Sequence, residues 1–370
     1  VQGYFTRLRE TGLYVISAED EKTSPYYGVP YTSIGKKHAN EVGFFVQDEW
    51  NVTPKLTVVP GIRVDSHSSG EEYATSVKVS DSAFPTTKFS KTTVNPRIAI
   101  KYELTPSLVL RANVGTGFRA PYGFSEDLHL CSGSPRVWKS SNLKGERAIS
   151  YNLSADYYAK KYQFSINIFR TNLKDKIQFS PADDEVKKFG YSYQWENVDD
   201  AYVQGVELGA KANLFRNFNA GINWTFNQGK FKHERADWSD PNDETVKEFP
   251  QRLQYAKDSR NISRFPAMTG DIDLDYTPGT WTFSLTSSLQ GRMFIDYNSE
   301  DDGATSKIKK TNTFMIFNCR AAKRFGTCTV YAGAKNIFSY IQDEKHTDDA
   351  AFMYAPVYGA TWYVGLSVKL

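Results

Sequence analysis

The segment Thr280-Trp281-Thr282-Phe283-Ser284-Leu285-Thr286-Ser287-Ser288-Leu289-Gln290-Gly291-Arg292-Met293 decides the fold of this chain. Most of its odd-numbered positions are apolar, and polar side chains occupy its even-numbered positions. Because successive side chains of a β-strand point to opposite faces, this order gives a strand with one apolar and one polar face. Residues 361–370 repeat the pattern. The sequence therefore predicts an all-β protein.

The length of the alternating segments separates two kinds of β protein. A soluble β-sandwich turns its apolar faces inward, whereas a membrane barrel turns them outward to lipid. The alternating segments run to about 11–15 residues, which is longer than typical globular strands and long enough for a tilted membrane crossing. Mean hydropathy is −0.52, but alternating strands average out to polar, so this value does not exclude a transmembrane barrel.

Short and long connections alternate along the chain. Turn-forming residues indicate six short turns, and longer polar segments indicate seven loops. An up-and-down membrane barrel has this arrangement, with short turns at one end and long loops at the other. We therefore predict a transmembrane antiparallel up-and-down β-barrel to which this chain contributes about 14 strands. The predicted turns are 51–55, 104–107, 159–162, 214–217, 277–280 and 323–327, and the predicted loops are 18–36, 67–88, 118–145, 179–190, 230–260, 295–310 and 338–357.

Charge and cysteine content narrow the function classes. The net charge is +3 and the basic residues are spread along the chain, so we expect no nucleic-acid partner. No Ser/His/Asp grouping or zinc-ligand spacing stands out, so we expect neither an enzyme nor a zinc site. Cys319 and Cys328 flank a predicted turn and are expected to lie opposite each other on neighbouring strands. A cross-strand disulfide and two separate small residues are equally consistent with this placement.

Two short motifs lie at the ends of one predicted loop. The first is Val114-Gly115-Thr116-Gly117-Phe118-Arg119-Ala120-Pro121, and the second is Ser140-Ser141-Asn142-Leu143-Lys144-Gly145-Glu146. This pair resembles the "FRAP" and "NPNL" boxes of TonB-dependent outer-membrane receptors, a family that imports haem, ferric siderophores and cobalamin. Ser141 and Gly145 stand where that family often has proline. Segments 44–50, 95–102 and 197–208 are also similar to strands of the family, so the resemblance spans nearly the whole chain.

The resemblance implies an architecture, a location and partners. Members carry an N-terminal plug followed by a barrel of about 22 strands in the bacterial outer membrane. Residues 1–370 would then be the C-terminal part of the barrel, with the plug, the TonB box and roughly eight strands missing from its N-terminal side. The implied partners are the TonB–ExbB–ExbD complex, which acts through that missing region, and the lipids of the outer membrane. A surface lipoprotein or a haemophore is a further candidate partner.

The resemblance also implies site residues. The family motif comprises Gly117, Phe118, Arg119, Ala120, Pro121, Asn142 and Leu143. We expect these residues to be mainly structural, because proline removes a ladder donor and ends a strand. His129 lies between the two boxes, where a histidine ligates haem iron in haem receptors of this family, and a neutral imidazole is a usual haem ligand. A solvated loop histidine without a ligand is the alternative. The other histidines are expected in separate loops or at loop edges, at His38, His67, His233 and His346.

The implied function is TonB-dependent uptake of a scarce, bulky nutrient through the outer membrane. Haem or a haemoprotein is the leading expectation because of His129, and a ferric siderophore or cobalamin follows. We expect no permanent cofactor, so haem would enter as a transported ligand. The alternative is a passive porin or an adhesin-like outer-membrane barrel, which would need neither a plug nor a TonB box.

Overall fold

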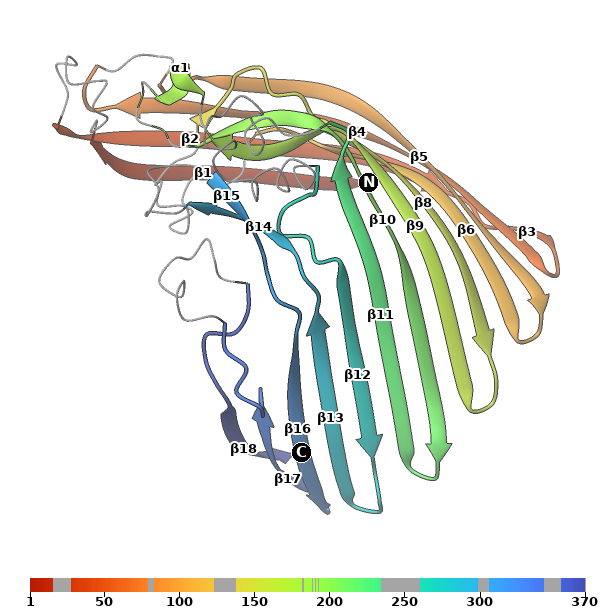
Figure 1. Ribbon diagram of the computed structural model, residues 1–370. Helices are drawn as coiled ribbons and strands as arrows, with labels where there is room; N and C mark the ends of the chain where they lie inside the picture. The colour runs from red at the N-terminus through yellow and green to blue at the C-terminus, as the bar shows by residue number, and fades with distance from the viewer. Residues whose placement is uncertain are drawn as a thin grey trace, which may run out of the picture.

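The computed structural model is a curved wall of antiparallel strands (Figure 1). It describes residues 1–15, 28–78, 83–122, 138–181, 183–187, 189, 191, 193–233, 260–298, 306–342 and 354–369. No helix in these ranges is long and apolar enough to span a membrane. The described elements are β1 (Gln2–Val15), β2 (Pro30–Gln47), β3 (Trp50–Thr53), β4 (Leu56–Thr75), β5 (Thr87–Thr105), β6 (Leu108–Arg119), β7 (Trp138–Lys139), β8 (Glu146–Tyr158), β9 (Tyr162–Pro181), α1 (Asp184–Lys187), β10 (Tyr193–Phe215), β11 (Phe218–Phe231), β12 (Met268–Tyr276), β13 (Trp281–Gln290), β14 (Phe294–Asn298), β15 (Ser306–Lys310), β16 (Phe314–Phe325), β17 (Cys328–Lys335) and β18 (Thr361–Val368).

Each long strand pairs with its neighbours in the sequence. Within the described ranges, the main sheet has sixteen strands, and fourteen of them form the path β1-β2-β4-β5-β6-β8-β9-β10-β11-β12-β13-β16-β17-β18. The other two strands of this sheet pair beside the path, β3 on β4 and β7 on β10, while β14 and β15 form a separate hairpin. The predicted antiparallel up-and-down fold is therefore confirmed, and its path contains the fourteen strands predicted, to which the structure adds the short strands β3 and β7.

The tight turns gather at one end of the wall (Figure 1). All six predicted turns occur, between β3 and β4, β5 and β6, β8 and β9, β10 and β11, β12 and β13, and β16 and β17. Asn217, Gly279 and Gly326 have φ values of 65°, 65° and 60° in three of these turns. Glycine and asparagine reach this left-handed region at low cost, so the sequence specifies where the chain reverses.

Alternation gives the wall two different faces. On β9, Phe164, Ile166 and Ile168 lie on one face and are 41–52% exposed. The intervening Asn167 lies on the other face and donates a hydrogen bond to Glu207 of β10 (2.9 Å). We call the apolar face the outer face and the polar one the inner face. A transmembrane barrel turns the outer face to lipid and the inner face to its lumen.

Several strands extend far beyond the predicted lengths. β4, β9 and β10 contain 20, 20 and 23 residues, respectively. The prediction of a loop at 67–88 is therefore wrong for residues 67–75, which belong to β4. The prediction of a loop at 18–36 is wrong for residues 30–36, which belong to β2. Segment 295–310 was also predicted as a loop, but it contains most of the β14–β15 hairpin. Beyond the apolar part of the wall both faces of a strand are polar, so alternation no longer marks the strand in the sequence.

Cys319 and Cys328 do not face each other, and this prediction is wrong. Cys319 lies opposite Ala334, and Cys328 lies opposite Phe325. Both thiols are free. The β16–β17 turn is centred on Gly326 and the following threonine rather than on Lys323 and Arg324, which moves the register by six residues. A disulfide between these two cysteines is therefore excluded.

Candidate functional site at the loop end of the wall

The first motif lies where the wall splits. Gly117, Phe118 and Arg119 are the last residues of β6, and Ala120 and Pro121 follow the strand. β6 pairs with β8 up to its last residue, but its pairing with β5 ends at Gly115, opposite Arg97. β5 continues along β4 instead. The motif therefore stands beside a gap between β5 and β6.

Phe118 fills this gap with its ring. The ring stacks on Phe89 of β5 with 6.0 Å between centroids. It also contacts the imidazole of His67, at 4.9 Å, and Lys91 Nζ lies 5.5 Å from its centroid. The role of Phe118 in this structure is packing, which agrees with the prediction that the motif is mainly structural.

The second motif is tied to the first by Tyr122. The Tyr122 hydroxyl donates a hydrogen bond to the Ser140 carbonyl (2.7 Å) and accepts one from the Leu143 amide (3.0 Å). Leu143 packs with Tyr122, Ile177 and Trp195 in a buried cluster. Burial raises the pKa of Tyr122 to about 12, while the Leu143 hydrogen bond acts in the opposite direction. We call Tyr122, Ser140 and Leu143 the clasp, because they join the two ends of the 118–145 segment.

Asn142 and the residues that follow complete this connection. Asn142 is exposed, and its backbone N–H donates a hydrogen bond to Ser140 Oγ (3.2 Å). The next residue, Lys144, exchanges two hydrogen bonds with the Asn197 side chain, at 2.8 and 3.0 Å. Asn197 also donates to the Asp175 carbonyl (2.8 Å). Sequence reasoning placed Asn197 in a family strand but did not identify this bridging role.

A buried ion pair fixes the same segment to β4. Lys139 Nζ lies 2.9 Å from Glu71 Oε1, and the two side chains are 3% and 0% exposed. Tyr73 donates a second hydrogen bond to the Glu71 carboxylate (2.7 Å). Lys139 belongs to β7, which pairs in parallel with β10. Sequence reasoning missed this pair, because the two residues are 68 positions apart and nothing local marks either one as buried.

A polar row lines the inner face of β2 and β4. Arg63 bonds to Asp65 (2.6 Å) and to Glu41 (3.1 Å), and it remains 28% exposed. The His67 ring lies between Glu41 Oε2 (3.5 Å) and the Thr93 hydroxyl (3.1 Å). Carboxylate, guanidinium and imidazole groups thus stand together on the face that a barrel turns to its lumen, where they can bind polar parts of a ligand.

The predicted histidines have different fates. His129 and His346 lie outside the described residues. His38 and His67 belong to strands β2 and β4 rather than to loops, so their predicted positions are wrong. His233 follows β11, and its ring lies 3.1 Å from Asp199 Oδ1. In the described part of the chain, no group of three or more His, Cys, Asp or Glu side chains is placed to hold a metal ion.

Comparison with known proteins explains the paired motifs. The family model described as "TonB dependent receptor-like, beta-barrel" matches residues 3–337. This chain belongs to the TonB-dependent receptor family. The family assignment made from the two boxes is thus confirmed, and with it the location in the outer membrane of a Gram-negative bacterium.

Two curated relatives and two solved structures illustrate the family. The vitamin B12 transporter BtuB of Photobacterium profundum is 26% identical over 266 residues, covering 70% of this chain and 36% of that protein. The ferric enterobactin receptor PirA of Pseudomonas aeruginosa is 20% identical and covers 90% of this chain and 42% of its own length. The ferric citrate transporter FecA and the copper transporter OprC share the fold, each with a TM-score of 0.60 over 91% of this chain, at 19% and 18% identity. They are covered over 45% and 48% of their lengths, respectively.

This TonB-dependent receptor chain spans less than half the length of those relatives. Its described residues form a wall with an apolar outer face and a polar inner face, and the two ends of the 118–145 segment are joined to that wall. The clasp and the Lys139–Glu71 ion pair hold the two ends of the 118–145 segment against the wall.

Proposed function

We propose that this chain forms part of a TonB-dependent outer-membrane transporter that takes up a scarce chelated metal or cobalamin. The observation that carries the proposal is the family match over residues 3–337. Relatives in that family are named for vitamin B12 and ferric enterobactin, and structural neighbours for ferric citrate and copper. The polar inner row of Glu41, Arg63 and His67 supports the proposal, because a chelate carries oxygen and nitrogen groups that such side chains bind.

The complete transporter would contain a plug and barrel strands in addition to residues 1–370. The chain would supply the C-terminal strands, and an N-terminal plug and further strands would complete a closed barrel. Support comes from the share of each relative that is matched, 36% and 42%, and from a pairing path that has β1 and β18 as its two ends. The TonB–ExbB–ExbD complex would act on the plug. A passive porin or adhesin-like barrel is not favoured, because the matched family consists of energised receptors.

Haem is the second candidate ligand, and it rests on one residue. His129 lies between the two motifs, eight positions after Pro121, and imidazole is a common axial ligand of haem iron. The clasp and the Lys139–Glu71 ion pair anchor both ends of the segment that contains it. A surface lipoprotein or a haemophore would deliver haem in this version of the proposal.

Binding and uptake measurements test both candidates. Purified receptor is titrated with cyanocobalamin, a ferric catecholate, ferric citrate and haemin, with tryptophan fluorescence and the Soret band as readouts. We expect one of the first three ligands to bind and its uptake by cells to stop when TonB is deleted. Uptake that continues without TonB would refute the transporter proposal. A Soret spectrum of bound haemin that is the same in His129→Ala as in the parent protein would remove His129 as the iron ligand.

A further inference from the structure

The outer face of β8–β11 changes from apolar to polar along each strand. The change occurs at the same height on neighbouring strands. Ile168 of β9 lies opposite Val206 of β10, and the next outer-face residue of β9, Arg170, lies opposite Gln204. β9 has 20 residues, whereas about 9–11 residues cross a bilayer. The polar half therefore extends past the hydrocarbon core. Between Phe164 and Lys174, the outer-face residues of β9 are, in order, Phe164, Ile166, Ile168, Arg170, Asn172 and Lys174.

A basic cavity of about 620 Å³ lies at this boundary. Among the described residues, its lining includes five cationic side chains and a single carboxylate, Asp200. None of the five forms an ion pair with a carboxylate of the described chain. The cations are Arg147, Arg170, Lys174, Lys232 and Arg260. Such a concentration of positive charge selects an anionic ligand.

The carboxylates of the neighbouring positions point away from this cavity. Glu207 accepts a hydrogen bond from Asn167 on the inner face (2.9 Å). Glu146, next to Arg147 in the sequence, accepts one from the Ile177 amide (3.0 Å). Glu207 and Glu146 thus lie away from the outer-face cations, which leaves Asp200 as the carboxylate of the described residues that shares the cavity with them.

Arg170 is held in place for such a group. Its Nη1 donates to Gln204 Oε1 (2.6 Å), its Nε donates to Asn172 Oδ1 (2.9 Å), and its guanidinium stacks on Tyr202 at 4.4 Å from the ring centroid. Gln204 is itself fixed by Gln228 (2.9 Å). These bonds use two of the five N–H groups of the guanidinium, and the remaining donors match the geometry of a phosphate.

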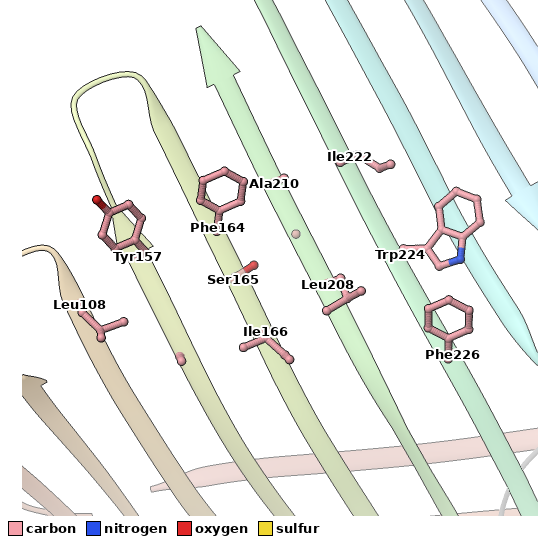
Figure 2. Close-up of a pocket in the computed structure, with 12 residues that line it drawn as sticks. Leu108, Tyr157, Phe164, Ser165, Ile166, Leu208, Ala210, Ile222, Trp224 and Phe226 are labelled. Carbon is pink, nitrogen blue, oxygen red and sulfur yellow. The ribbon is translucent and has the colours of Figure 1, made fainter. Parts of the chain in front are cut away.

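An apolar hollow lies on the same face, nearer to the tight turns (Figure 2). It also measures about 620 Å³. Ile166, Leu208 and Phe226 line it, and small residues such as Ala210 form part of its lining. Ile166 is four residues from Arg170, which is roughly 13 Å along an extended strand. A basic cavity and an apolar hollow at this separation fit a molecule with an anionic head and a hydrocarbon tail.

We propose that the outer face of β8–β11 binds a phosphorylated lipid of the outer leaflet. Its phosphate occupies the cavity between Arg147, Arg170 and Lys174, and an acyl chain fills the hollow beside Ile166 and Leu208. This binding fixes the depth at which the wall sits in the membrane. The proposal requires the outer-membrane location of the family and is independent of which nutrient is transported.

The test measures binding of lipid A, an acylated glucosamine disaccharide with two phosphates, to the purified receptor in mixed micelles. Each of Arg147→Gln, Arg170→Gln and Lys174→Gln should weaken binding roughly fivefold, and the triple variant about a hundredfold. Dephosphorylated lipid A should bind the parent protein as weakly as lipid A binds the triple variant. Ala210→Trp, which fills the apolar hollow, should weaken binding of every acylated probe.

Arg97→Gln with Lys101→Gln is the matched control, because these cations of β5 lie on the inner face, and it should leave lipid binding unchanged. Equal binding of phosphorylated and dephosphorylated lipid would overturn the proposal. Competition by millimolar inorganic phosphate as effective as that by lipid A would also overturn it, because the cavity would then be a site for free phosphate. Nutrient titrations on the same triple variant separate this result from a failure of the proposed function.

Discussion

Removing Lys139 should free the segment that carries the second motif. Lys139→Met removes the ammonium group 2.9 Å from the Glu71 carboxylate, which is buried at 0% exposure. Breaking a buried ion pair in this way costs about 3–5 kcal/mol. The Tyr73 hydroxyl still donates to Glu71 (2.7 Å), so we expect the lower end, about 3 kcal/mol. Because the pair joins β7 to β4, this loss falls on local opening of the segment rather than on the strands.

Hydrogen exchange of the Leu143 amide reports this opening, since that amide is bonded to the Tyr122 hydroxyl in the closed clasp (3.0 Å). A loss of about 3 kcal/mol lowers its protection roughly a hundredfold. Lys144→Met is the matched control, because Lys144 is 73% exposed and lies 3.9 Å from its partner Asp175. An exposed pair is worth about 0–1 kcal/mol, so protection should change less than about fivefold.

The double variant Lys139→Met/Glu71→Gln completes the cycle. Replacing both members of a buried pair is often close to neutral, so most of the lost protection at Leu143 should return. The reasoning fails if Lys139→Met leaves protection at the parent level. It also fails if the double variant exchanges as fast as the single one, because the buried charge would then not be the cause.

Four further predictions concern the wall and the clasp. Phe118→Ala should lower the free energy of unfolding by about 2 kcal/mol, because packing on Phe89 and His67 is lost. The measurement is the thermal midpoint in detergent, which should fall. Phe118→Leu is the control and should retain most of the stability. Tyr122→Phe should speed exchange of the Leu143 amide, because it leaves that amide and the Ser140 carbonyl unpaired. The pKa of Tyr122 is raised to about 12 in the folded protein. The protonated hydroxyl therefore contributes its full stabilisation below a pH of about 10, and this contribution is lost as the pH rises to about 12. The alkaline denaturation profile of Tyr122→Phe should lack this pH-dependent loss, and a profile identical to that of the parent protein would contradict the buried position of the Tyr122 hydroxyl. Peptide mapping after alkylation without reductant should find no bond between Cys319 and Cys328, and a linked peptide would refute the observed register.

The sequence predicted the features that local chemistry encodes. Turn residues such as Asn217 and Gly326 marked every tight turn, and alternation marked the strands wherever one face is apolar. It did not predict the loop ends of the strands, because Ser66, His67 and Ser68 are polar on both faces. It also missed Lys139 and Glu71, whose burial arises only when β7 folds onto the wall. The cysteine register failed because a shift in the centre of a turn changes every pairing that follows.

The two motifs are in direct contact, because Gly145 of the second motif packs against the Phe118 ring of the first. A side-chain carbon at Gly145 would meet the ring of Phe118 and would lie 3.1 Å from the Arg119 carbonyl. In this chain, glycine at position 145 therefore permits the Phe118 ring to fill the gap between β5 and β6. Together with the clasp and the Lys139–Glu71 pair, this contact fixes both ends of the segment that contains His129. Because both ends are fixed by contacts outside the segment between them, we expect substitutions within that segment, such as His129→Ala, to leave strand pairing and the thermal midpoint in detergent unchanged.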